Sequence, residues 1–266
     1  MSESRNEVAI ELAMPDGECL RGMLQPGKQG RGVPAVVFAH GFGSSREGEK
    51  AQALKAECAR REWAFAACDF RGHGQSGGSP LTLRGSSLIE DLDAVTRWVA
   101  RLTDGPLFLM GSSMGGWAAA WLSANAPDRA RACALVAPAF YFLEFRGLSK
   151  SELDAWRRTG CHVFNNGWMD VEVGYGLAEE SIKFPVSELA QKFRTPLILF
   201  HGMHDEVIPY SASVEFAAKC AATKVELRLL KEGDHRLNYA KKEVVRQACD
   251  FFERFLTPVS GSLPSV

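Results

Sequence analysis

Short, uninterrupted apolar runs recur along the chain, and they limit the folds open to it more than any other feature. Examples are PAVVFA at residues 34–39, AFAAC at 64–68 and PLILF at 196–200. Runs this short are typical of strands that are covered on both faces in a parallel sheet, because a buried helix needs a longer segment. The sequence therefore predicts a sheet whose strands lie inside the molecule.

Segments with helical periodicity separate these runs. In residues 86–100 the apolar side chains of Leu88, Leu92 and Val95 fall on one helical stripe. The expected strands are 7–13, 19–24, 34–39, 64–68, 106–110, 132–137, 196–200 and 225–230, and the expected helices are 49–61, 86–100, 114–124, 211–220 and 241–255. This alternation predicts an α/β fold with a mostly parallel eight-stranded sheet, flanked by helices, and a ligand site at the carboxyl ends of the strands.

One stretch, residues 139–186, interrupts this alternation, because it separates two strands by far more than one helix needs. It holds nine aromatic residues in 48, about twice the chain-wide 10%: Phe140, Tyr141, Phe142, Phe145, Trp156, Phe164, Trp168, Tyr175 and Phe184. Insertions of this length are usually functional. We predict a core made of residues 1–138 and 187–266, with 139–186 as a cap or lid. A helical insert with a small core of its own is an alternative that is compatible with this role.

A serine stands between an expected strand and an Ala-rich helix, in the sequence Gly111-Ser112-Ser113-Met114-Gly115. A serine held on a tight strand-to-helix turn needs small neighbours, since larger side chains at the flanking positions would clash. The spacing to both glycines favours Ser113 over Ser112 as a nucleophile. The N–H groups at the start of the helix would point toward the same site.

A neutral serine is a weak nucleophile and needs a general base. Of the six histidines, His235 follows the last expected strand, at the edge of the sheet where Ser113 emerges. We predict that His235 is the base. His40 and His201 each end a strand and precede a glycine, so we expect them to make loop hydrogen bonds or to line the site.

The base in turn needs an acid that fixes its tautomer. Asp205 follows the strand 196–200 and is the predicted partner of His235. Asp234 is adjacent to His235 in the chain, and adjacent side chains rarely face each other; Glu206 is one position away and would point elsewhere. The resulting order along the chain is Ser, Asp, His.

The tetrahedral intermediate of acyl transfer needs two backbone N–H donors. We predict that Met114 supplies one and Phe42 the other, from the loop His40-Gly41-Phe42-Gly43 that follows the strand 34–39. The Gly-rich segment 69–76 has no phosphate-binding motif and is expected to be a structural loop beside the site. This chemistry calls for neither a metal ion nor an organic cofactor.

Composition excludes several other functions. The formal net charge is −1 and no run of basic residues stands out, so we expect no binding to nucleic acid. No apolar run approaches the roughly 20 residues of a membrane span, and residues 1–7 do not resemble a signal peptide. The seven cysteines form no Cys-x-x-Cys pair, which favours free thiols in a reducing compartment. We therefore expect a cytoplasmic protein, with its oligomeric state left open.

Over residues 7–256 the chain resembles the α/β-hydrolase superfamily. The resemblance rests on five motifs: HGFG at 40–43, DFRGHGQS at 69–76, GSSMGG at 111–116, HGMHDEVIP at 201–209 and GDHR at 233–236. Within the superfamily the chain is similar to small bacterial carboxylesterases of the cinnamoyl (feruloyl) esterase kind, and to the mitochondrial depalmitoylase and acyl-glucuronide hydrolase group. These families imply ester or thioester hydrolysis through Ser113, Asp205 and His235.

The aromatic insert favours a small-molecule substrate with a short-to-medium acyl or aryl group. A thioesterase that acts on long acyl chains is the first alternative. An amide- or peptide-cleaving hydrolase could use the same three residues. A non-catalytic binding protein on this scaffold is disfavoured, because such chains usually lose a member of the triad.

Overall fold

A computed structural model of the protein describes residues 7–28, 32–165 and 170–256. Trp168 and most of the polar N-terminal stretch therefore lie outside the described residues. The central element is a sheet of eight strands in the order β1-β2-β4-β3-β5-β6-β9-β10. The strands are β1 (Val8–Ala13), β2 (Cys19–Gln25), β3 (Ala35–Ala39), β4 (Ala64–Cys68), β5 (Leu107–Ser112), β6 (Cys133–Val136), β9 (Leu197–Gly202) and β10 (Val225–Leu230).

The sheet is mostly parallel, as the sequence predicts. Strand β2 pairs antiparallel with both β1 and β4, whereas every pairing from β4 to β10 is parallel. Strands β3, β4, β5, β6 and β9 are buried along their whole length. Their carboxyl ends therefore meet at one edge of the sheet, and the loops that follow them meet there too.

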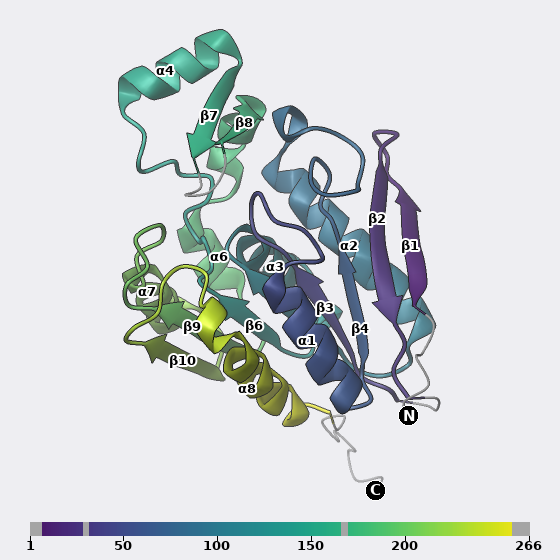
Figure 1. The fold of residues 1–266 in the computed structure, drawn as a ribbon. Coiled ribbons are helices and arrows are strands. Elements are labelled where there is room, and N and C mark those ends of the chain that lie inside the picture. Colours follow the sequence, from purple (N-terminus) through teal and green to yellow (C-terminus); the bar gives the residue numbers. More distant parts are fainter. Residues whose placement is uncertain (1–6, 29–31, 166–169, 257–266) are drawn as a thin grey trace, which may run out of the picture.

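Helices cover both faces of the sheet (Figure 1). On one face, α1 (Glu49–Arg60) packs beside α8 (Lys241–Glu253). The other face carries α2 (Gly85–Leu102), α3 (Met114–Asn125), α6 (Val186–Lys192) and α7 (Ser211–Lys219). The described parts of the core and of the insert also contain short 3-10 helices, which are η1 (Pro80–Thr82), η2 (Pro127–Arg129), η3 (Ser181–Lys183) and η4 (Asn238–Ala240). The sequence analysis did not predict α6, which has seven residues and is too short for a clear helical period.

The insert, residues 139–186, contains α4 (Lys150–Thr159), the antiparallel pair β7 (Cys161–Asn165) and β8 (Asp170–Gly174), and α5 (Gly176–Glu179). Figure 1 shows α4 and this pair beyond the end of the main sheet. The Trp156 side chain is buried, and its indole N–H donates to the carbonyl of Val173. Its ring packs against those of Phe145, Phe164 and Tyr175.

The insert thus has a small aromatic core of its own, as the alternative expects, but it is not the helical insert of that alternative because it also contains the pair β7 and β8. Its role as a lid stays a prediction.

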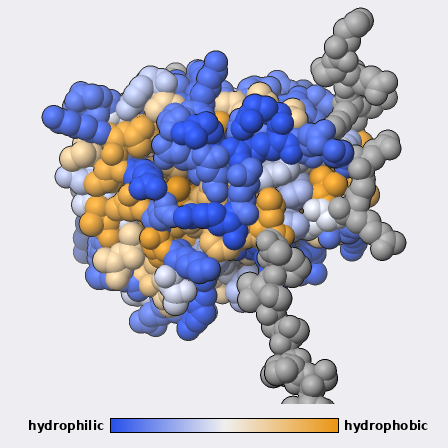
Figure 2. Space-filling view, turned by 90° about the horizontal axis from the view of Figure 1, so that it is seen from below, coloured by the Kyte–Doolittle hydropathy of each residue, from blue (hydrophilic) through white to orange (hydrophobic). Residues whose placement is uncertain are grey.

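The surface of the protein carries both hydrophilic and hydrophobic side chains. Figure 2 views the molecule from below and shows mainly hydrophilic side chains, with hydrophobic ones gathered toward one side. No helix in the described part of the chain combines the length and the apolar character that crossing a bilayer requires.

Candidate active site

The turn between β5 and α3 holds Ser113 in a strained conformation. Its backbone angles are φ 53° and ψ −117°, a region that residues with a side chain rarely adopt. A Cβ atom on Gly111 would lie 2.4 Å from the carbonyl oxygen of Gly115, and one on Gly115 would lie 2.2 Å from that of Ala39. These glycines are therefore required for the close approach of α3 to the strands, as the sequence predicts.

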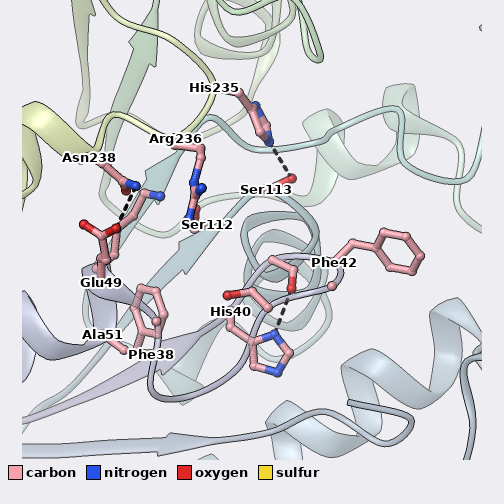
Figure 3. A pocket seen from close by; sticks show the side chains of 15 residues that line it. Phe38, His40, Phe42, Glu49, Ala51, Ser112, Ser113, His235, Arg236 and Asn238 are labelled. Carbon is pink, nitrogen blue, oxygen red and sulfur yellow. Dashed lines mark hydrogen bonds between the residues drawn. The ribbon is translucent and has the colours of Figure 1, made fainter. Parts of the chain in front are cut away.

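Three predicted site residues form one chain of hydrogen bonds. The Nε2 atom of His235 lies 3.1 Å from the Oγ atom of Ser113, and its Nδ1 atom lies 2.7 Å from the Oδ2 atom of Asp205. Because Nδ1 faces a carboxylate, this nitrogen carries the hydrogen, and Nε2 is left to accept from the serine hydroxyl. Figure 3 shows His235 directed toward Ser113. Ser112, the competing serine, ends β5 and is buried.

Asp205 lies on the loop after β9, with a fully buried carboxylate. Its Oδ1 atom accepts from the backbone N–H groups of Val207 and Ile208, at 2.9 and 2.8 Å. Its Oδ2 atom faces both His235 and His201. Burial alone would raise the pKa of Asp205, but the hydrogen bonds from the two histidines outweigh burial and hold this pKa well below its usual value. The residue therefore stays ionised beside His235.

His201 is a member of this network that the sequence analysis placed only in general terms. It is fully buried, and its Nε2 atom lies 3.0 Å from the carboxylate of Asp205 and 3.0 Å from the carbonyl of Ile208. Two acceptors face Nε2, so this nitrogen carries the hydrogen. The Nδ1 atom then accepts from the hydroxyl of Ser213, 2.8 Å away. The i, i+4 spacing of His201 and Asp205 around a strand end was the available signal.

We expect His201→Leu to lower kcat by about 10- to 100-fold, because Asp205 loses one of the donors that hold it in place. The free energy of unfolding should fall by about 1–3 kcal/mol, the cost of a buried polar group that loses its partner. His201→Gln keeps an N–H donor near the position of Nε2 and should restore most of the activity. Steady-state kinetics and thermal unfolding of both variants test this. Equal losses in the two variants would contradict a donor role.

The loop after β3 packs directly on the predicted nucleophile. A Cβ atom on Gly41 would lie 3.3 Å from the Cβ of Ser113 and 4.0 Å from its Oγ. Among the described residues, no hydrogen-bond acceptor faces the N–H of Phe42. Met114 is the first residue of α3, so its N–H has no acceptor within the helix. Neither of the two N–H groups predicted to hold an oxyanion thus has an acceptor among the described residues, and their role stays a prediction.

Two loops are held together beside the site by His40. Its Nδ1–H donates to the carbonyl of Gly41 at 2.9 Å, and its Nε2 accepts from the N–H of Phe70 at 3.0 Å. Burial, helped by the neighbouring His73, lowers the pKa of His40 to about 3, so the ring stays neutral and keeps both bonds. Asp69 accepts from the N–H groups of Arg46 and Gln75. The segment 69–76 is the structural loop that the sequence predicts.

Aromatic side chains pack around Phe42, which lies in the loop after β3. The ring of Phe142 lies 6.2 Å from that of Phe42 and 6.0 Å from that of Trp117, and Phe184 lies 5.2 Å from Trp117. Phe142 and Phe184 are therefore the insert aromatics that pack near the turn between β5 and α3, while Phe140 stacks on Phe216 of α7. The insert contributes less aromatic surface to the site than its composition suggests.

A cavity of about 170 Å³ reaches Ser113 and His235 from the side of α1. Figure 3 shows Arg236, Glu49 and Asn238 around it, with the ring of Phe42 pointing away. Within residues 7–28, 32–165 and 170–256, the side chains of His, Cys, Asp and Glu form no group of three or more that could hold a metal ion.

Comparisons with known proteins identify the family and the fold of this chain. The protein-family model Hydrolase_4, described as serine aminopeptidase, S33, matches residues 33–158 and 167–241. The mouse protein named palmitoyl-protein thioesterase ABHD10, mitochondrial, is 26% identical over 212 residues, which are 77% of this chain and 70% of that protein.

Solved structures show the same fold. The mouse alpha/beta hydrolase domain-containing protein 10 has a TM-score of 0.80 at 22% identity, over 93% of this chain and 99% of its own. The structure titled "Ferulic Acid bound to Est1E from Butyrivibrio proteoclasticus" has a TM-score of 0.80 at 20% identity, with the same coverage of 93% and 99%. The α/β-hydrolase fold predicted from the sequence is confirmed.

Proposed function

The chain belongs to the Hydrolase_4 family of α/β-hydrolases, and on that premise we propose that it hydrolyses carboxylic esters through an acyl-enzyme on Ser113. The observation that carries the proposal is the chain of hydrogen bonds from Ser113 through His235 to Asp205. A hydroxyl, a base and a buried acid in this geometry are the parts that nucleophilic acyl transfer needs.

In the first half of the reaction, His235 Nε2 takes the proton of Ser113 as Oγ bonds to the ester carbonyl carbon. The N–H groups of Phe42 and Met114 hold the oxyanion, where such donors are worth about 3–4 kcal/mol each. The intermediate collapses as the C–O bond to the alcohol breaks, and His235 gives its proton to the leaving oxygen. Asp205 stabilises the imidazolium between these two transfers.

In the second half, His235 takes a proton from water, and the resulting hydroxide attacks the acyl carbon. The same two N–H groups hold the second oxyanion. Collapse breaks the bond between the acyl carbon and Oγ, releases the acid and returns the proton from His235 to Ser113. The residues of this chain supply every proton transfer, and no cofactor enters the proposed steps.

The preferred substrates in this proposal have short-to-medium acyl or aryl groups. The ring of Phe42 packs near that of Phe142, which in turn packs near Trp117, and Phe184 packs against Trp117 as well. These contacts close to Ser113 support a compact, aromatic-walled acyl site.

A thioesterase for long acyl chains is the second candidate, because the curated relative reported above is named a palmitoyl-protein thioesterase. We expect kcat/KM to peak at acyl chains of about eight carbons or fewer across a series of p-nitrophenyl esters. Acyl thioesters of the same chain lengths should be hydrolysed less efficiently. A peak at palmitoyl together with a preference for thioesters would replace the first candidate with the second.

An amide-cleaving activity is the third candidate, which the name of the family model favours. Hydrolysis of alanine p-nitroanilide faster than p-nitrophenyl butyrate would establish it. A binding protein without catalysis would fail to react with a fluorophosphonate probe at Ser113.

We also propose a cytoplasmic location, which the seven free cysteines support and which subcellular fractionation tests.

A further inference from the structure

Two cationic side chains line the cavity that reaches Ser113. Lys50 lies in the first turn of α1, and Arg236 directly follows His235. They come from segments that are 186 residues apart in the chain. Neither has a part in the proposed acyl transfer, so their presence in one small cavity beside the nucleophile calls for another explanation.

The acidic groups near this cavity already have partners. Glu49 pairs with Lys241 and accepts from the side chain of Asn238 at 3.2 Å. Asp234 accepts from the backbone N–H of Leu237 at 2.7 Å. The ammonium group of Lys50, in contrast, has no ion pair or hydrogen bond with any residue that the structure describes, and Asp234 and Glu49 attract it only at longer range. The two cations therefore face the cavity without an acid dedicated to Lys50.

This arrangement destabilises the charged form of Lys50. Burial, followed by repulsion from Arg236, lowers the pKa of Lys50 to about 8. The ammonium group is still mostly charged at neutral pH, but it is poorly solvated. An anion between the two side chains would offset both the desolvation and the repulsion.

The cavity also lies on a defined side of the reaction centre. The leaving atom of an ester must be within reach of His235, which gives it a proton. The cavity wall continues from His235 to Arg236, whereas the ring of Phe42 points to the opposite side (Figure 3), where Phe142 lies. The cationic wall therefore faces the leaving group, and the aromatic wall faces the acyl group.

We propose that Lys50 and Arg236 form a subsite for an anionic group, a carboxylate or a phosphate, on the leaving-group side of the ester. The inference rests on the proposed ester hydrolysis and specifies its substrates further. A leaving alcohol or phenol that carries such an anion would be oriented by the cavity, while a neutral one of equal size would not.

The test compares two esters that differ only in charge, 3-acetoxybenzoate and 3-acetoxybenzamide. Both form the same acetyl-enzyme, and both release a phenol of similar size. We expect the wild-type kcat/KM to be about tenfold higher for the anionic ester, because its charge pairs with partly buried cations. Lys50→Met should abolish this preference and leave the turnover of 3-acetoxybenzamide within about twofold.

Lys242→Met is the matched control, because it removes the same charge from an exposed position on α8. It should keep the tenfold preference. A third ester, 3-acetoxyphenyl phosphate, tests whether the subsite prefers a phosphate or a carboxylate. Whichever of 3-acetoxyphenyl phosphate and 3-acetoxybenzoate has the higher kcat/KM identifies the preferred anion. Equal kcat/KM for the charged and neutral esters in the wild-type enzyme would overturn the subsite while leaving ester hydrolysis intact.

A binding measurement keeps the subsite testable if neither ester is hydrolysed, the result that contradicts the proposed function. Calorimetric titration of Ser113→Ala with 3-hydroxybenzoate should show binding that weakens about tenfold when Lys50→Met is added. It should be unchanged when Lys242→Met is added. Absence of binding to Ser113→Ala, or equal binding with Lys50→Met, would overturn the proposal.

Discussion

Replacing Ser113 with alanine should lower kcat for ester hydrolysis by about 10⁴- to 10⁶-fold, because the attacking oxygen is lost. The remaining rate enhancement would come from the N–H groups of Phe42 and Met114, which still bind the polarised carbonyl. KM should change far less than kcat. Steady-state kinetics with p-nitrophenyl butyrate, together with loss of fluorophosphonate labelling, measure the effect.

Two further variants separate chemistry from folding. Ser112→Ala changes the adjacent serine of the same motif and should keep kcat within about tenfold of the wild-type value. Ser113→Gly should be as inactive as Ser113→Ala but unfold at a higher temperature, because glycine adopts a φ of 53° without strain. An active Ser113→Ala enzyme, or an inactive Ser112→Ala enzyme with normal stability, would refute the assignment of the nucleophile.

Replacing Asp205 with asparagine should lower kcat by about 10⁴-fold, since His235 would then be held in the wrong tautomer. The structure adds a second reason. Two histidine N–H groups point at Oδ2 and two backbone N–H groups point at Oδ1. Whichever way the asparagine amide turns, its NH₂ group meets at least one N–H donor, so the free energy of unfolding should fall by about 1–3 kcal/mol. Kinetics and chemical denaturation of the variant measure both effects.

The stability difference should also depend on pH. The folded state holds the pKa of Asp205 below its unfolded value of about 3.9, so its stabilising contribution is complete above that pH and is lost as the pH falls toward the folded pKa. Wild type and Asp205→Asn should therefore differ most above about pH 5 and converge in acid. Glu206→Gln, which changes the exposed next residue, is the matched control and should behave as wild type. A pH-independent difference would contradict this explanation.

The main elements of the fold could be predicted from the sequence because each produces a local pattern. The expected strand 34–39 is β3 within one residue, and the expected helix 114–124 is α3 within one residue. The insert gave no such pattern. Its strands β7 and β8 are only partly buried and pair with each other, and α6 is too short to show a period. The structure of β7 and β8 depends on packing around Trp156, and that of α6, which lies in the core, on its contacts with α3 and α7.

The sequence by itself determined that Ser113, Asp205 and His235 would meet, because each follows a strand of the parallel part of the sheet and the carboxyl ends of such strands share one edge of the sheet. Only the tertiary structure decided which other side chains join them. His201 donates to Asp205, Phe142 lies near Phe42, and Lys50 shares a cavity with Arg236. Chain order and periodicity place a residue on an element. The direction of its side chain, and the distant residue that it contacts, depend on how the elements pack.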